Sequence, residues 1–298
     1  MKLEGIHHVT AITGDAPANV EFYADRLGLR LVKKSVNQDD PTVYHLFYAD
    51  EHGSAGSDIT FFEYPGATRG RPGRGMIHRV VFRIGSEDAL DFWQERVGGE
   101  RRDDSLLFAD PEGLGLELVL DDSGDEPLVA RHPEIPEALA IRGFDGVRAY
   151  GDPERSRRFL EEGLGFESGF VARGNYRRGF YVYDPPPGDR GISGAGTVHH
   201  VAWAAPMQEH AAWRERAAAA SATPTPVIDR YYFRSIYFRE PSGVLFEIAS
   251  IGPGFTVDEP EESLGERIAL PPSFEHLRDQ VERILTPLPS PRRAGVAS

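Results

Sequence analysis

The chain has 298 residues, of which 47 are acidic and 33 are basic, so its formal net charge is −14. Nucleic acids and anionic membranes attract proteins through a positive field, so this balance argues against both as partners and favours a small molecule. The chain has no cysteine. This excludes disulfides, zinc thiolate sites and thiol catalysis, and it leaves histidine and carboxylate as the available metal ligands.

The sequence runs from Met1 directly into a strand-like segment, with no charged leader and no apolar signal core. No later stretch reaches the length that crosses a membrane. These features predict a cytoplasmic enzyme. Lysine occurs only at positions 2, 33 and 34, and this scarcity together with the acidic surplus is compatible with a high-salt habitat.

The first predicted structural unit begins at residue 5. A β-rich run at residues 5–12 precedes Asp15, which is typical of a helix N-cap, and a helical pattern of apolar residues follows over 20–27. The unit closes with a strand-like segment at residues 58–63. This order predicts a strand, a capped helix and further strands.

The next two units repeat the same order. Residues 76–82 predict a strand, Ser86 predicts a helix N-cap, and residues 107–118 predict a hairpin. In the third unit, a short strand signal at residues 143–147 precedes Asp152, which opens a further helix. The three units therefore share one pattern of elements, which indicates an internal repeat.

The fourth unit carries the clearest strand signals. Residues 198–203 predict a strand, an alanine-rich helix around Trp213 follows, and residues 234–248 predict a hairpin whose second strand carries Glu247. The tail contains one more amphipathic helix at residues 273–285. We expect this helix to pack on the outside of the C-terminal half.

Together the units predict an α+β fold of four βαβββ modules that form two open mixed-sheet barrels, with a C-terminal helical tail. An acidic, turn-rich segment between the second and third modules predicts a boundary. The predicted parts are an N-terminal domain of two modules (1–124), a linker (125–140), a C-terminal domain of two modules (141–255) and a tail with a packed helix (256–298).

One short motif occurs twice, an apolar residue followed by two histidines and a valine, at residues 6–9 and 198–201. Imidazoles on paired strands, followed by the carboxylate of Glu247, are typical of a metal site with two histidines and one carboxylate. Such a site leaves positions open, as in Fe(II) enzymes that bind a substrate and dioxygen together. Strand alternation predicts His8 and Thr10 on one face of the first strand and His7 on the other.

The sequence resembles the vicinal oxygen chelate superfamily of glyoxalases, bleomycin-resistance proteins and dioxygenases, which is defined by paired βαβββ modules. It is most similar to hydroquinone-type ring-cleaving dioxygenases, over nearly its whole length. The similarity is carried by the GIHHVT start, the DRYYFRSIYFREPSGVLFEIAS segment and the DEPEESLGERIALPP tail.

The resemblance implies that His8, His200 and Glu247 bind one metal ion per chain, Fe(II) or alternatively Mn(II). The aligned positions of the second and third modules carry Arg79 and Asp145, so these modules cannot build the same site. The first and fourth modules must then meet around the ion.

The resemblance also implies supporting residues that orient the ligands and handle protons. The residues with implied catalytic roles are His199, Arg230 and Tyr237, and those of the surrounding shell are His7 and Thr10.

The implied activity is the opening of hydroquinone-type or related diphenol rings with O2, so the expected partners are a small aromatic substrate and O2. A homo-oligomer is compatible with the sequence. The alternative is a glyoxalase-like metal isomerase or lyase with Glu63 as a fourth ligand, and alternation does not decide whether Glu63 or Phe62 faces the metal. A non-enzymatic sequestering protein is disfavoured, because it needs no metal.

Overall fold

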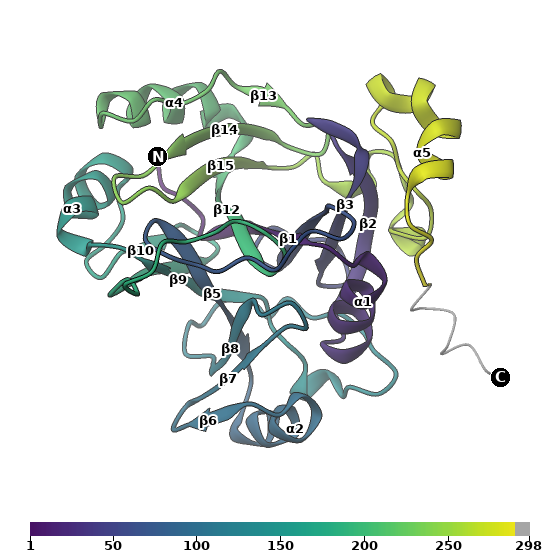
Figure 1. The fold of residues 1–298 in the computed structure, drawn as a ribbon. Helices are drawn as coiled ribbons and strands as arrows, with labels where there is room; N and C mark the ends of the chain where they lie inside the picture. Colours follow the sequence, from purple (N-terminus) through teal and green to yellow (C-terminus); the bar gives the residue numbers. More distant parts are fainter. Residues whose placement is uncertain (290–298) are drawn as a thin grey trace.

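The computed structural model describes residues 1–289, which form two mixed β-sheets with helices around them (Figure 1). The strands of this part of the chain are β1 (Ile6–Thr13), β2 (Arg30–Asn37), β3 (Asp40–Ala49), β4 (Asp58–Glu63), β5 (Met76–Ile84), β6 (Glu100–Arg102), β7 (Ser105–Ala109), β8 (Gly115–Leu120), β9 (Phe144–Tyr150), β10 (Val171–Arg173), β11 (Arg178–Asp184), β12 (Thr197–Pro206), β13 (Ile228–Asp229), β14 (Arg234–Arg239) and β15 (Leu245–Ile251).

The α-helices are α1 (Ala16–Val20), α2 (Glu87–Val97), α3 (Pro153–Arg158), α4 (His210–Ala219) and α5 (Arg278–Ile284). The π-helical turns η1 (Glu21–Arg26) and η3 (Phe159–Leu164) extend α1 and α3. Short 3-10 turns are η2 (Glu137–Leu139), η4 (Met207–Glu209), η5 (Phe255–Val257), η6 (Glu261–Ser263) and η7 (Pro272–Leu277).

Three helix starts follow the predicted caps. The side chains of Asp15, Ser86 and Asp152 each accept a hydrogen bond from a backbone N–H in the first turn of α1, α2 and α3. Such caps satisfy donors that have no partner within the helix. The local sequence therefore fixes where each of these helices begins.

The order of strands shows which modules combine. The eight-stranded sheet has the order β13-β14-β15-β12-β1-β4-β3-β2, and the seven-stranded sheet has the order β10-β11-β9-β5-β8-β7-β6. The first sheet therefore joins modules one and four, and the second joins modules two and three. The predicted α+β class of mixed sheets is confirmed, and each sheet takes one module from each half of the chain. Whether residues 1–124 and 141–255 fold as separate units stays a prediction.

The third module has one strand fewer than predicted. After η3 ends at Leu164, the chain reaches β10 at Val171 with only an isolated bridge between Glu167 and Val171. Gly169 and Phe170 both have positive φ angles, which bend this short segment into a turn. No room remains there for an outer strand, so the module is βαββ.

The predicted tail helix exists, and its position corrects one expectation. Residues 272–284 form η7 and then α5, and α5 lies against β3 of the first module (Figure 1). The preceding segment is held by the buried Lys33, whose ammonium bonds to Asp258 at 2.7 Å and also contacts Glu259. This buried charge directs the tail to the N-terminal half of the chain instead of the C-terminal half.

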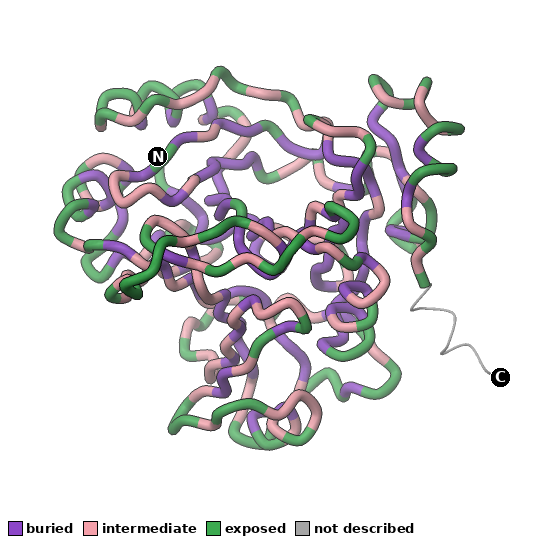
Figure 2. Tube along the Cα trace, in the orientation of Figure 1, coloured by how far each residue is buried: buried purple, intermediate pink, exposed green. Residues whose placement is uncertain are grey.

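Buried residues follow the central strands of both sheets (Figure 2). One apolar cluster extends through both sheets, and a smaller one includes Phe47, Tyr232 and Phe233 beside the functional site described below. Within residues 1–289, no helix has both the length and the apolar character that crossing a membrane would need.

Candidate metal centre

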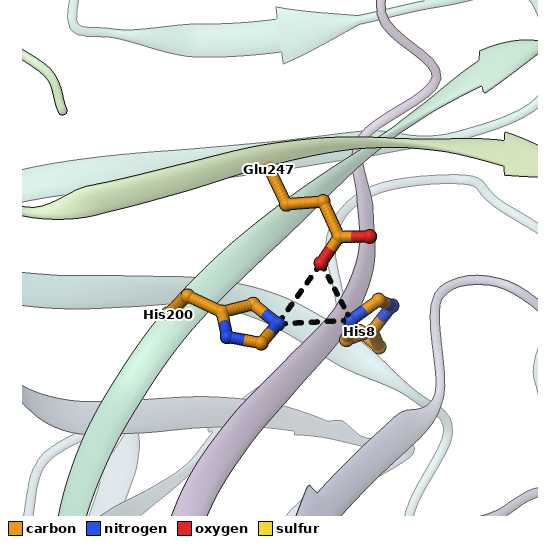
Figure 3. Close-up of side chains that lie close together, drawn as sticks. All are labelled: His8, His200 and Glu247. Atoms are coloured by element: carbon orange, nitrogen blue, oxygen red, sulfur yellow. Dashed lines mark hydrogen bonds and ion pairs between the residues drawn. The ribbon is translucent and has the colours of Figure 1, made fainter. Parts of the chain in front are cut away.

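His8, His200 and Glu247 converge where β1, β12 and β15 lie side by side (Figure 3). The two Nε2 atoms are 3.2 Å apart, and Glu247 Oε2 lies 3.2 Å from His8 Nε2 and 2.9 Å from His200 Nε2. All three side chains are buried. Three potential metal-ligating atoms thus surround one point inside the protein.

A β-bulge accompanies each histidine pair. In the antiparallel pairing of β1 with β12, the register shifts by one residue at His7 and again at His199. A bulged residue interrupts the alternation of side chains. The prediction that His7 points away from His8 is therefore wrong, because the two Nδ1 atoms lie 3.0 Å apart.

The hydrogen bonds of His7 determine which nitrogen of His8 is free. His7 Nε2 lies 3.2 Å from the carbonyl oxygen of Ser250, which only accepts, so Nε2 carries the proton. Burial, and then the charge of His8, lowers the pKa of His7 to about 3, so its Nδ1 is unprotonated and accepts from His8 Nδ1–H. His8 Nε2 is left with its lone pair toward the centre.

His199 supports His200 in a similar way from a more exposed position. Its Nδ1 lies 2.8 Å from Nδ1 of His200, while the residue itself is exposed at the cavity wall. Burial of the ring and the charge of His200 lower the pKa of His199 to about 4, so it is neutral at pH 7. Its remaining ring nitrogen has no protein partner in the part of the chain that the structure describes.

Glu247 is ionised although it is fully buried. Burial raises its pKa, but the interactions with the His8 and His200 imidazoles outweigh burial and hold the pKa well below its usual value. Ser235 on β14 donates a hydrogen bond to Oε1 at 2.5 Å. Oε2 has no hydrogen bond of its own. A buried carboxylate oxygen without a partner is costly unless a cation binds it.

A cavity of about 370 Å³ opens in front of these three residues. Its walls come from both modules of the eight-stranded sheet, which curves around it. Aromatic and aliphatic side chains form much of the lining: Val36, Phe47, Phe62, Ile228, Tyr232, Phe233 and Leu245. The space is suited to a planar aromatic molecule with one edge at the metal centre.

Arg230 and Tyr237 line the same cavity. The guanidinium of Arg230 lies 5.5 Å from the ring centroid of Tyr237 and forms two bonds, of 3.0 and 2.9 Å, to the carboxylate of Asp39. Arg230 thus pairs with Asp39 of the first module and not with its neighbour Asp229. Burial and the charge of Glu247 raise the pKa of Tyr237, so its hydroxyl stays protonated at neutral pH.

The donor set fits a divalent ion with two histidines and one carboxylate on one face. Metal–ligand bonds of about 2.1 Å at right angles place neighbouring ligand atoms about 3.0 Å apart, and the observed separations are 2.9 to 3.2 Å. The unpartnered oxygen of Glu247 and the lone pair of His8 Nε2 point to the same fit.

Comparison with known proteins agrees with this arrangement. The profile of the Glyoxalase/Bleomycin resistance protein/Dioxygenase superfamily matches residues 5–101 and 147–248. The chain belongs to this superfamily.

Similar proteins within the superfamily carry dioxygenase names. The chain is 40% identical to a protein of Bacillus subtilis (strain 168) named "Putative ring-cleaving dioxygenase MhqO", over 96% of this chain and 97% of the relative. It is 32% identical to the "Chlorohydroquinone/hydroquinone 1,2-dioxygenase" of Sphingobium indicum, over 95% and 96%. These relatives support an oxygenase enzyme.

Solved structures show the same architecture. A Bacillus subtilis protein described as a "putative dioxygenase" superposes with a TM-score of 0.88 at 38% identity, over 97% of this chain and 98% of that one. Glyoxalase I from maize superposes with a TM-score of 0.53 at 15% identity, over 83% and 92%, which shows a shared fold only.

The superfamily fold also decides the position of Glu63. Thr60 pairs with Thr10, two residues after His8, and Glu247 pairs with Ala202, two residues after His200. Thr60 is therefore the counterpart of Glu247. Glu63 lies three residues further along and accepts hydrogen bonds from Ala16 N–H and the Thr286 hydroxyl. Phe62 lines the cavity. The hypothesis of Glu63 as a fourth ligand is therefore wrong.

The other sheet has the same bulges, but residues 1–289 contain no second group of converging metal ligands there. Its β5–β9 register places Arg79 at the position of His8 and Gly146 at that of His200, so Asp145 matches His199 instead of the predicted ligand position. Arg79 forms an ion pair of 3.2 Å with Glu117. This pair occupies the region where the first sheet gathers its ligands.

Two residues of the site, Ser235 and His45, were not predicted from the sequence, and one predicted residue has a different contact. Ser235 bonds to Glu247, and His45 on β3 lies 2.9 Å from the Thr60 hydroxyl. Thr10 accepts a hydrogen bond from Thr60 at 2.8 Å, so it is part of the chain of hydrogen bonds that includes His45 and does not contact a metal ligand through this group. A usable signal existed for Ser235 alone, because the turn at residues 240–243 fixes the β14–β15 register and places Ser235 diagonally beside Glu247.

Proposed function

We propose that this chain is a metal-dependent dioxygenase that opens hydroquinone-type rings with O2, using Fe(II), or alternatively Mn(II), bound by His8, His200 and Glu247. The observation that carries the proposal is the convergence of three ligand atoms at one end of an aromatic-lined cavity. The relative named for chlorohydroquinone and hydroquinone supports the substrate class.

When bound, the ion would lower the pKa of a phenolic hydroxyl and couple the ring to O2. The protein's own groups then position the substrate. Tyr237 presents a protonated hydroxyl and Arg230 a permanent positive charge, and both suit the oxygen of a phenolate. His199 accepts at Nδ1 when His200 ligates through Nε2, so its Nε2–H is a donor at the cavity wall.

The test is O2 uptake by protein loaded with Fe(II) under anaerobic conditions, with hydroquinone, catechol and a methylglyoxal–thiol adduct assayed side by side. We expect stoichiometric O2 uptake and ring opening with hydroquinone. Turnover of the thiol adduct without O2 uptake from either diphenol would establish the isomerase alternative and overturn the proposal. The position of Glu63 away from the ligands argues against that alternative.

A further inference from the structure

His45 lies in the cavity wall and has no part in the metal centre. It lines the same cavity as the ligands, but its nitrogens fall outside the group of converging ligand atoms. Its ring is held by two aromatic neighbours, with centroid distances of 3.9 Å to Phe47 and 4.4 Å to Phe62. These contacts fix the orientation of the imidazole in the cavity wall.

A chain of hydrogen bonds fixes the tautomer of His45. Thr60 donates its hydroxyl proton to Thr10 Oγ1 at 2.8 Å, so the Thr60 oxygen accepts from His45 Nε2–H at 2.9 Å. Burial, followed by the charges of His8 and His200, lowers the pKa of His45 well below its usual value, so the ring is neutral. Nδ1 of His45 therefore carries a lone pair.

This lone pair faces the cavity. Nδ1 of His45 has no protein partner among residues 1–289. It is not one of the fully buried polar atoms of these residues, so it is accessible from the cavity. The neighbouring polar groups Arg230 and Tyr237 act as donors toward a bound ligand. Beside these donors, His45 offers the ligand a neutral acceptor, and an acceptor recognises a hydroxyl group.

We infer that His45 accepts a hydrogen bond from the second hydroxyl of the diphenol and selects rings whose two hydroxyls are far apart. This inference rests on the proposed function and narrows its substrate class. In a catechol both oxygens are adjacent and reach one ion together. In a hydroquinone the second hydroxyl lies at the opposite end of the ring and cannot bind the same ion, so it needs a partner in the cavity wall that is not a metal ligand.

The test compares binding of hydroquinone and 4-fluorophenol to Fe(II)-loaded protein without O2, by calorimetry. 4-Fluorophenol keeps one hydroxyl and replaces the second by a group that cannot donate. We expect the wild type to bind hydroquinone about tenfold more tightly, as one satisfied hydrogen bond predicts. In His45→Phe, which preserves the aromatic stack, the two dissociation constants should become equal. His45→Gln, which keeps an acceptor, should retain part of the preference.

A matched control is His52→Phe, since His52 is an exposed histidine paired with Glu261 outside the cavity. It should behave as the wild type. Equal affinities in the wild type, or an unchanged preference in His45→Phe with normal iron content, would overturn the inference. Because binding is measured without turnover, failure of the proposed function appears separately, as absence of O2 uptake with hydroquinone by the wild type.

Discussion

Thr60 on β4 and Glu247 on β15 hold equivalent positions in the two halves of the eight-stranded sheet. The repeat of the module therefore supplies two histidines but only one carboxylate at the centre. The hydroxyl at position 60 serves the chain of hydrogen bonds to His45 instead. The difference between a three-ligand and a four-ligand centre thus depends on this one residue.

Thr60→Glu should convert the centre to four protein ligands. We expect tighter Fe(II) binding and loss of most O2 uptake, because the new carboxylate occupies a position that substrate or O2 needs. Iron affinity and O2 uptake are measured on the same preparation. Thr60→Val, which has the same shape and no carboxylate, should keep wild-type iron affinity. Full O2 uptake by Thr60→Glu with normal iron content would contradict the equivalence of positions 60 and 247.

Glu63→Gln should leave the metal centre intact and alter stability. Burial raises the pKa of Glu63, although hydrogen bonds from Thr286 and Ala16 oppose this. The folded protein thus holds this proton more tightly than the unfolded chain, and its free energy of unfolding falls as pH rises above the ordinary carboxyl pKa of about 4.3. Glutamine does not titrate.

The stability gain of Glu63→Gln over the wild type should therefore grow between pH 4 and pH 7 in urea denaturation experiments. Its iron affinity should equal that of the wild type, because Glu63 contacts α1 and the tail and no metal ligand. Weakened iron binding in this variant would restore Glu63 as a ligand.

Ser235→Ala should weaken metal binding by about 10- to 100-fold, the usual effect of removing a group that orients a ligand. The variant loses the bond to Glu247 Oε1 and leaves that buried oxygen without a donor. Chelator competition measures the change. Ser156→Ala is a matched control, because Ser156 donates to the buried Glu240 at 2.6 Å outside the centre. If both variants bind iron equally, Ser235 has no specific role.

His7→Phe should reduce iron affinity more than His199→Phe. His7 is buried, so its loss leaves His8 Nδ1–H without an acceptor and frees the ring to turn. His199 is exposed, and water can replace its contact with His200. Iron titrations of the two variants give the comparison. The reverse order would show that the hydrogen bond from His7 to Ser250 does not set the ligating tautomer.

The local sequence predicted the elements and a site of two histidines and one carboxylate because these signals are contiguous, and the family resemblance implied His8 and His200 within the two His-His pairs. The pairs and the strand glutamate lie in short segments, and helix caps such as Asp15 act within one turn. The prediction of an outer strand in the third module was wrong, and the reason is also local. Its segment is short and turns at Gly169, so it forms no strand.

The remaining features depend on strand register across the sheet. Glu63 and Thr60 differ by three positions on one strand, and only pairing with β1 and β3 shows which one faces the centre. His45 gains its role from Thr60 on the neighbouring strand, and His7 from a bulge opposite β12. Such contacts join residues far apart in the chain, so local patterns do not reveal them.

Whether His8, His200 and Glu247 form a catalytic iron centre is tested most directly by iron content together with O2 uptake after anaerobic Fe(II) loading, in the wild type, Glu247→Gln and Glu117→Gln. Glu117 is the control, because it holds the matching position in the other sheet and pairs with Arg79. We expect one iron per chain and hydroquinone-dependent O2 uptake in the wild type and Glu117→Gln, and loss of both in Glu247→Gln. Full iron content and wild-type O2 uptake in Glu247→Gln would show that Glu247 does not bind the metal.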